Sequence, residues 1–187
     1  MTLENAFVMN TSNIKYGPGA TREIGYDMRA LGAKRVMAVV DPHLVHEEPV
    51  VVALESLRAA GVQATLFYRV RIEPTDASFK DAILFAQDGK FDGYVAIGGG
   101  STMDTAKAAN LYTTYPADFL AYVNAPIGEG RPVPGRLAPL IAVPTTAGTG
   151  SETTGTAIFD LEEMHVKTGI AHPALRPGEY FAGRDRN

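Results

Sequence analysis

The sequence predicts an α/β domain built around a parallel β-sheet. Over the first 113 of its 187 residues, short apolar runs alternate three times with segments of helical periodicity. That is the pattern of parallel strands joined by crossover helices. The strand expected at 35–40 is a continuous apolar run, as in a parallel strand that is covered on both faces. The third observation is the segment from Tyr94 to Lys107, where an apolar run that we expect to be a buried strand is followed by three glycines and then by an expected helix.

Each expected element of the first half has a local signal. Short apolar runs bounded by Gly, Pro or Asp predict strands, and apolar residues three or four positions apart predict helices that end near a glycine. The expected strands are 6–9, 35–40, 62–68 and 94–97. The expected helices are 21–31, 49–61, 75–89 and 101–113.

The pattern changes after residue 113. A short helix is expected at 117–123, a loop rich in Pro and Gly at 125–139, and a further buried strand at 140–143. Residues 154–159 and 165–171 are expected to form a β-hairpin. We therefore expect one domain over residues 1–177 and an irregular tail over 178–187.

Composition excludes several classes of function. The chain is 45% hydrophobic and 20% charged, with a net charge of −4, whereas binding of nucleic acid or a membrane surface calls for a basic face. It contains no Cys, so thiolate chemistry is excluded. No segment approaches the roughly 20 apolar residues of a membrane span, and the first residues do not resemble a secretory signal. We expect a cytoplasmic protein with no nucleic-acid or membrane partner.

The glycine stretch predicts a phosphate-binding loop. Gly98, Gly99 and Gly100 allow a sharp turn and a close approach of the backbone to a ligand, because no Cβ is in the way. Ser101 is a good helix N-cap, and Asp104 stands three residues later, like the acidic half of a capping box. The amides and the positive dipole at such a helix start favour an anion.

Two more polar features follow expected strands. Asp41 follows the strand at 35–40, and the hydroxyl-rich loop 145–151 follows the strand at 140–143. In open α/β sheets ligands bind outside the carboxyl ends of the strands, so the three features together predict a dinucleotide site. A carboxylate that binds the ribose hydroxyls disfavours a 2′-phosphate, which favours NAD over NADP. Alternatively, Asp41 is only a turn residue before Pro42.

Other common motifs are missing. Neither the P-loop pattern nor the usual dinucleotide fingerprint fits, because the acidic residue precedes the glycines. The four histidines have no metal-ligand spacing, and there is no nucleophile elbow. No catalytic acid, base or nucleophile and no metal ligand can be assigned from the sequence.

Two long motifs carry a family resemblance. The stretches 98–107 and 144–152 are similar to the two signature loops of the iron-containing (group III) alcohol dehydrogenases, in the right order and spacing. Residues 71–79, 122–128 and 166–171 resemble more narrowly the hydroxyacid-oxoacid transhydrogenase branch. The resemblance implies a Rossmann-like NAD-binding domain with an added β-hairpin. In the family an all-helical domain with Fe²⁺ or another divalent metal follows, and no segment of this sequence resembles it.

The resemblance also implies site residues, position by position. Lys167 matches a basic residue that faces the cofactor in relatives, whereas Glu73 stands where many members carry Asn. The full set of candidate cofactor-binding residues is Asp41, Gly98, Gly99, Gly100, Ser101, Asp104, Thr145, Thr146, Thr149 and Lys167.

The function expected from the resemblance is hydride transfer between a short hydroxy acid or alcohol and NAD, in a homo-oligomer. For these 187 residues alone, we expect cofactor binding with little or no turnover. One alternative is a non-catalytic nucleotide-binding module from a truncated gene. A polyol or sugar-phosphate enzyme such as glycerol dehydrogenase is a third alternative, and the motif at 144–152 argues against it.

Overall fold

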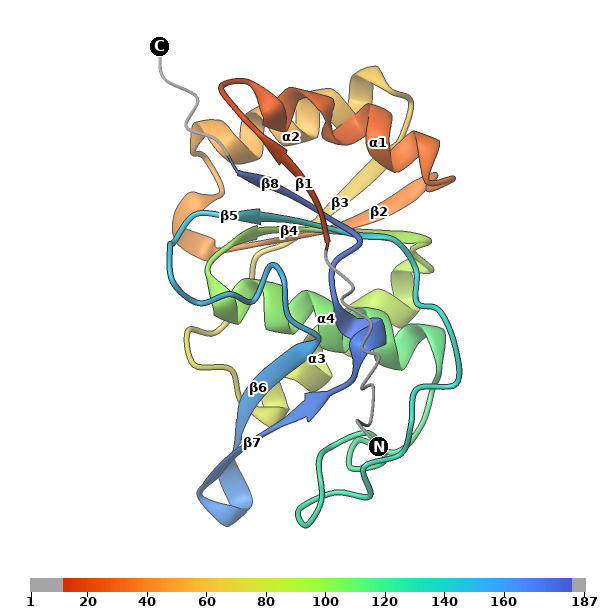
Figure 1. The fold of residues 1–187 in the computed structure, drawn as a ribbon, viewed down its shortest axis with the longest axis vertical. Coiled ribbons are helices and arrows are strands. Elements are labelled where there is room, and N and C mark those ends of the chain that lie inside the picture. Colours follow the sequence, from red (N-terminus) through yellow and green to blue (C-terminus); the bar gives the residue numbers. More distant parts are fainter. Residues whose placement is uncertain (1–11, 183–187) are drawn as a thin grey trace, which may run out of the picture.

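The computed structural model describes residues 12–182 and shows a parallel sheet between two helical layers (Figure 1). The sheet has six strands in the order β1-β8-β5-β4-β2-β3, and every neighbouring pair is parallel. Its strands are β1 (Asn13–Tyr16), β2 (Arg35–Val40), β3 (Gln63–Phe67), β4 (Gly93–Gly98), β5 (Leu140–Pro144) and β8 (Glu179–Ala182). The α-helices are α1 (Ile24–Ala30), α2 (Glu48–Ala59), α3 (Asp76–Gly89) and α4 (Gly100–Thr114).

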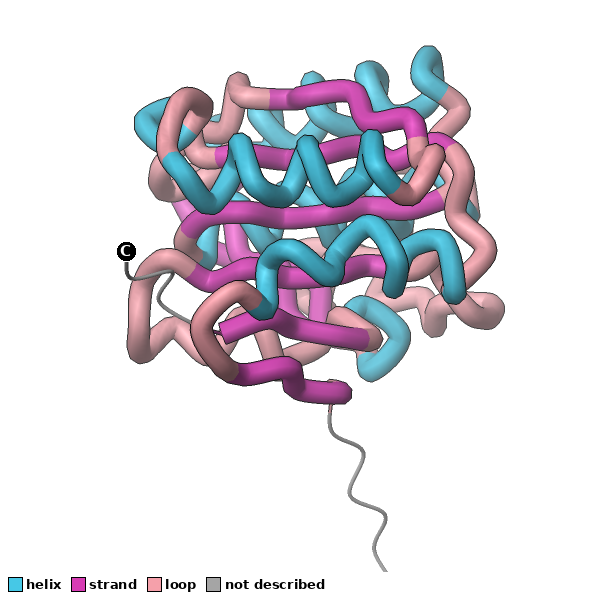
Figure 2. The backbone as a smooth tube through the Cα atoms, turned by 90° about the horizontal axis from the view of Figure 1, so that it is seen from above, coloured by secondary structure: helices cyan, strands magenta, loops and turns pink. Residues whose placement is uncertain are grey.

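The two faces of the sheet carry separate apolar clusters, as the continuous apolar runs of β2, β4 and β5 predict. Val36, Ala38 and Val40 of β2 pack with α1 and α2 on one face. Met37 and Val39 point the other way and pack with α3 and α4. The alternation follows from the period of two along a strand, and the layers are visible in Figures 1 and 2.

Local sequence explains where the helices begin. α2 carries Pro49 in its first turn, where the missing N–H costs nothing. α3 begins with a capping box, in which Thr75 and Ser78 exchange side-chain hydrogen bonds with each other's backbone N–H groups.

A hairpin lies beside α3 and α4, in agreement with the prediction. It consists of β6 (Thr156–Leu161) and β7 (Val166–Ala171), joined by a short 3-10 turn. Phe159 of β6 packs against Phe79 of α3 and against Phe119, with ring centroids 5.3 Å apart in both pairs. The hairpin is therefore fixed to the layer under the sheet.

The structure differs from the expected elements at three places in the described chain. Residues 117–123 form turns rather than a helix, because Phe119 and Tyr122 pack on the ring of Tyr112 instead. β1 was not among the expected strands; it is short and mostly exposed at the edge of the sheet. The tail expected to be irregular contains β8, which lies between β1 and β5. The strand expected at 6–9 and the end of the tail, 183–187, lie outside the described residues.

The connections that follow β2 and β4 leave the carboxyl edge of the sheet toward opposite faces. The chain leaves β2 toward α2 on one face and leaves β4 toward α4 on the other, although β2 and β4 are neighbours. Where the connections of two neighbouring parallel strands go to opposite faces of the sheet, the space outside the carboxyl ends of these strands is the usual place for a ligand.

Candidate functional site

Three of the predicted features meet at this carboxyl edge of the sheet. The backbone N–H of Asp41 donates to Ile97 O at 3.1 Å, and that of Thr145 donates to Gly98 O at 3.0 Å. Asp41, the glycine loop and the second polar loop therefore lie side by side across β2, β4 and β5. Asp41 Oδ1 also accepts from His43 N–H at 2.9 Å, so its carboxylate caps the short turn that follows β2.

The glycine loop and the second loop (145–151) are in close contact. A Cβ on Gly99 would lie 3.1 Å from Thr146 Oγ1, and one on Gly100 would lie 3.4 Å from Thr149 Cβ. A Cβ on Gly98, where φ is 157°, would lie 2.3 Å from Thr102 Oγ1. The absence of side chains at Gly99 and Gly100 thus lets the second loop pack directly against the glycine loop.

The first turn of α4 is available to an anion. The helix begins at Gly100 with Gly99 as its N-cap, and no side chain caps it. Ser101 is therefore not the N-cap, and the capping box predicted with Asp104 does not form. An uncapped helix start with the positive end of its dipole suits a phosphate group.

A cavity of about 230 Å³ lies beside this helix start. Five of the predicted residues line it, and the hairpin contributes Lys167, whose Nζ lies 3.8 Å from Asp160 Oδ1. The lining residues are Glu73, Pro74, Gly100, Ser101, Asp104, Thr149, Ile158, Phe159 and Lys167. A cation, hydroxyl groups and a helix start surround one cavity, which can hold a phosphorylated or polyhydroxyl ligand.

Four lining residues were not predicted to be in the site: Glu73, Pro74, Ile158 and Phe159. They reach it because the loop before α3 lies over the helix start, where Glu73 N–H donates to Ser101 Oγ at 3.2 Å. The hairpin joins the same loop through a hydrogen bond from Asp160 N–H to Pro74 O at 2.8 Å. Neither contact leaves a local signal in the sequence.

Glu73 has a strained backbone, with φ of 55°. A non-glycine residue in this region costs about 1 kcal/mol, and Asn tolerates it better than Glu. We expect Glu73→Asn to raise the free energy of unfolding by about 0.5–1 kcal/mol, measured by urea denaturation. The matched control Glu163→Asn changes an exposed residue without positive φ, and it should have little effect. An equal rise in the free energy of unfolding in both variants would contradict the assignment of backbone strain to Glu73.

A buried charged network lies behind the cavity. Lys107 Nζ donates to Ser151 Oγ at 2.8 Å and to Thr156 O at 2.7 Å, and it lies 3.5 Å from Asp104 Oδ1. Asp104 Oδ1 accepts from Ser151 Oγ at 2.5 Å, and its Oδ2 accepts from Ile158 N–H at 3.0 Å. Burial lowers the pKa of Lys107, and the Asp104 carboxylate opposes that shift. Although Asp104 borders the cavity, its oxygens are already engaged by protein donors.

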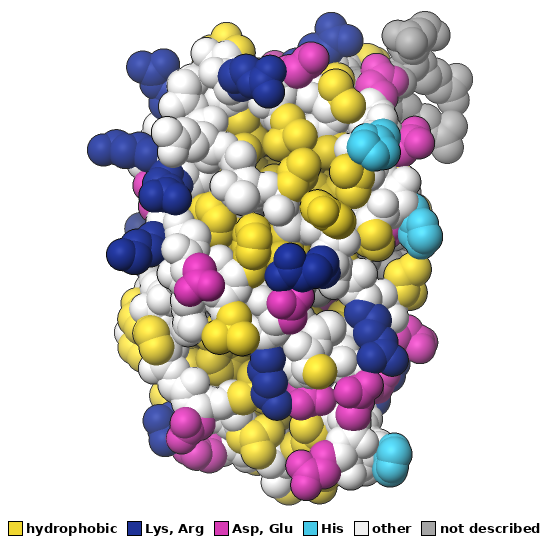
Figure 3. Space-filling model, turned by 180° about the vertical axis from the view of Figure 1, so that it is seen from behind, with side chains coloured by type: hydrophobic (Ala, Val, Ile, Leu, Met, Phe, Trp, Pro, Cys, Tyr) yellow, Lys and Arg dark blue, Asp and Glu magenta, His cyan; other side chains and the backbone are white. Residues whose placement is uncertain are grey.

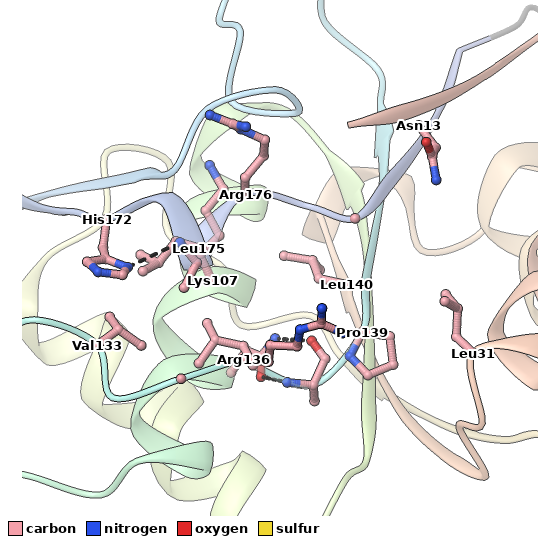
Figure 4. A pocket seen from close by; sticks show the side chains of 16 residues that line it. Asn13, Leu31, Lys107, Val133, Arg136, Pro139, Leu140, His172, Leu175 and Arg176 are labelled. Carbon is pink, nitrogen blue, oxygen red and sulfur yellow. Dashed lines mark hydrogen bonds between the residues drawn. The ribbon is translucent and has the colours of Figure 1, made fainter. Parts of the chain in front are cut away.

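A second, larger cavity of about 550 Å³ lies at the opposite, amino edge of the sheet (Figure 4). None of the predicted site residues lines it. Its polar lining includes Arg136, Arg176 and His172, whose Nδ1 accepts from Ala174 N–H at 3.1 Å. It shares no lining residue with the first cavity.

Residues 12–182 do not provide a metal centre. Within that range, no three His, Asp or Glu side chains are grouped so that they could hold a metal ion. The divalent metal implied by the family resemblance therefore does not fit the described residues, and no chemical step in this domain is assigned to it. Nor is any helix of the described chain long and apolar enough to cross a membrane.

Comparison with known proteins places this geometry in context. The family described as iron-containing alcohol dehydrogenase matches residues 11–180. Two curated relatives, the proteins of Mus musculus and Homo sapiens named "Hydroxyacid-oxoacid transhydrogenase, mitochondrial", are each 57% identical over 177 residues. These matches cover 94% of this chain and 38% of each relative. The solved structure of 1,3-propanediol oxidoreductase has a TM-score of 0.87 and 28% identity, over 96% of this chain and 46% of that chain.

These relatives correct the predicted location, and they show how much of a relative's length the chain matches. Because their names place them in mitochondria, the expected cytoplasmic location is wrong. The chain spans less than half the length of the relatives and of the solved structure.

Proposed function

The chain belongs to the iron-containing alcohol dehydrogenase family, and on this premise we propose that its α/β domain binds NAD(H). The glycine loop and the second loop meet beside Asp41, where the connections after β2 and β4 leave toward opposite faces of the sheet, and this arrangement carries the proposal. The uncapped start of α4 supports binding of the pyrophosphate there.

Each predicted residue has a proposed role. Gly98, Gly99, Gly100 and Ser101 present backbone and hydroxyl donors to the pyrophosphate, and Asp41 accepts from a hydroxyl of the adenosine ribose. The second loop adds hydrogen bonds from Thr145, Thr146 and Thr149. Lys167 supplies a positive charge from the far side of the cavity. Asp104 acts through the buried network rather than by direct contact.

The reaction we propose for the protein is reversible hydride transfer between a short hydroxy acid or alcohol and an oxo acid, through bound NAD. The 57% identity to the two transhydrogenases supports this substrate class. When NAD is bound, its nicotinamide supplies the hydride acceptor. The domain described here orients that cofactor, and we expect the 187-residue chain by itself to bind NADH with little or no turnover of 4-hydroxybutyrate. Robust metal-dependent turnover by this chain would contradict the second expectation.

Asp41 provides the test of the cofactor site. We expect Asp41→Asn to weaken NADH binding roughly tenfold, because one charge-assisted hydrogen bond is lost. The same change should tighten NADPH binding, because repulsion of the 2′-phosphate is removed. Asn also caps turns well, so the cap on His43 N–H and the melting temperature should be retained. Fluorescence titration with each cofactor measures the Kd for NADH and the Kd for NADPH, and the ratio of the two is compared between wild type and Asp41→Asn.

The wild-type chain is the control in this titration. No NADH binding by a folded wild-type chain would overturn the proposed function. Equal effects of Asp41→Asn on NADH and NADPH would leave Asp41 as a capping residue only.

A non-catalytic nucleotide-binding module that self-associates is a second candidate, favoured by exposed apolar surface. Seen from behind, the molecule shows hydrophobic side chains gathered among charged ones (Figure 3). Exposed large hydrophobic residues of the described chain include Tyr26, Tyr68 and Leu84. Light scattering, run beside the NADH titration, separates the candidates: a stable assembly that does not bind NADH favours the module.

A further inference from the structure

Lys107 is a fully buried cation that the cofactor contacts proposed above do not use. It lies on α4, about two turns after the glycine loop, at the centre of the buried network. A buried ammonium group is costly unless it is paired and hydrogen-bonded, and Lys107 Nζ has three oxygen neighbours within 3.5 Å.

Each partner of this network belongs to a different part of the site. Asp104 is on the helix that carries the glycine loop, Ser151 ends the second loop, and Thr156 begins the hairpin that carries Lys167. The second oxygen of Asp104 reaches the hairpin again through Ile158 N–H. One buried network therefore joins three of the four segments that line the cavity; the fourth is the loop before α3.

The second loop depends on this anchor. Its residues 145–149 are exposed, and Gly148 and Gly150 have φ of 104° and 67° with nothing within 4 Å of an added Cβ. At its start the loop is held by a hydrogen bond from Thr145 N–H to Gly98 O. At its end Ser151, which is buried, binds both Lys107 and Asp104.

We propose that Lys107 is a positioning residue that, through Ser151, holds the second loop over the glycine loop in the geometry that binds the cofactor. This inference rests on the proposed function, because it assigns the loop geometry to NAD(H). Lys107 itself makes no contact with the cofactor.

The test uses the 187-residue chain with Ser151→Ala and Lys107→Met, and with Ser151→Thr as the conservative variant. We expect Ser151→Ala and Lys107→Met to raise the Kd for NADH at least tenfold and to speed hydrogen exchange of the amides of 145–150. Ser151→Thr keeps the hydroxyl and should restore most of the affinity. If Lys107→Met does not fold, Ser151→Ala decides, because it removes only the hydroxyl that links the loop to the network.

Asn110→Ala is the matched destabilised control. Asn110 is also buried on α4, but its side chain bonds Ala138 O and N–H at 2.8 and 3.2 Å, at the opposite edge of the sheet. It should lower the melting temperature and leave the Kd for NADH and the exchange of 145–150 unchanged. An unchanged Kd in folded Ser151→Ala, or an equal rise in Asn110→Ala, would overturn the proposal.

The NADH titration of the wild-type chain separates this inference from the proposed function. If the wild-type chain binds no NADH, the proposed function and the inference that rests on it both fail, whatever the exchange rates show. If the wild type binds NADH and Ser151→Ala binds it equally well with the same exchange rates, only the positioning role fails.

Discussion

Replacing Asp104 by Asn is expected to lower the free energy of unfolding by about 3–5 kcal/mol at neutral pH, because it leaves the buried Lys107 ammonium without its counter-charge. Lys107 is fully buried, and the side chain of Asp104 is 13% exposed, so water cannot replace the carboxylate. The amide of Asn keeps only one acceptor oxygen, so either Ser151 Oγ–H or Ile158 N–H would face a donor in place of the acceptor that it has now. Urea denaturation measures the loss.

This loss should depend on pH. Burial lowers the pKa of Lys107 from 10.5, and Asp104 raises it, so removing the carboxylate lowers the pKa of Lys107 further. A lysine with a lowered pKa binds fewer protons in the folded than in the unfolded chain between the two pKa values, so stability rises with pH in that range. The deficit of Asp104→Asn should therefore shrink as the pH approaches 10.5. Burial raises the pKa of Tyr94 to about 12 in wild type and variant alike, so its effect cancels in the difference.

Asp160→Asn is the control for both effects. Asp160 pairs with Lys167 at 3.8 Å, and both side chains are at least one-third exposed, so the pair contributes less than about 1 kcal/mol. A pH-independent deficit in Asp104→Asn, or an equal deficit in Asp160→Asn, would contradict the assignment of the loss to the buried charge.

Replacing Gly25 by Ala is expected to destabilise the protein by about 3 kcal/mol or more. Gly25 lies where α1 crosses α2, and a Cβ there would lie 2.1 Å from Ser56 O and 2.7 Å from Leu57 N. These are backbone atoms of α2, so the two helices must move apart. The shift would also disturb the hydrogen bond from Gly25 N–H to Ser56 Oγ at 2.9 Å.

Thermal unfolding measures this loss, with an expected fall in melting temperature of roughly 6–12 °C for a chain of this size. Gly178→Ala is the matched control, because no atom lies within 4 Å of its added Cβ and its φ is not positive. Because Ala favours a helix interior over Gly by about 1 kcal/mol, a stabilised Gly25→Ala variant would show that α1 and α2 are not in close contact.

Much of the fold follows from local patterns. The continuous apolar runs predicted β2, β4 and β5, because a parallel strand between two helical layers buries both of its faces. Thr75 is the N-cap of α3 and Gly89 is its last residue, so the signals for both ends of the helix are local in the sequence. Where the prediction failed, at residues 117–123, the packing of Phe119 and Tyr122 on Tyr112 outweighed a weak helical periodicity.

The site was predictable only in part. Asp41, the glycine loop and the second loop each follow a strand, so the parallel pairing of these strands brings all three to the carboxyl edge of the sheet. Glu73 enters the site from the loop before α3, and its distance in sequence from Ser101 hides that contact. Ser101 and Asp104 look locally like a capping box, but α4 begins one residue earlier with Gly99 as its N-cap. Asp104 instead accepts hydrogen bonds from Ser151 Oγ and Ile158 N–H, which lie far away in the sequence.

By itself, the sequence determined the alternation of strands and helices, the buried strands of the sheet and the glycine-rich start of α4, because each depends on neighbours within a few residues. Only the tertiary structure decided that β8 lies between β1 and β5, that the hairpin brings Lys167 to the cavity, and that Lys107 pairs with Asp104 and Ser151. These contacts join segments far apart in the chain. Their stability comes from excluding water around paired polar groups, a property of the packed molecule that no local pattern records.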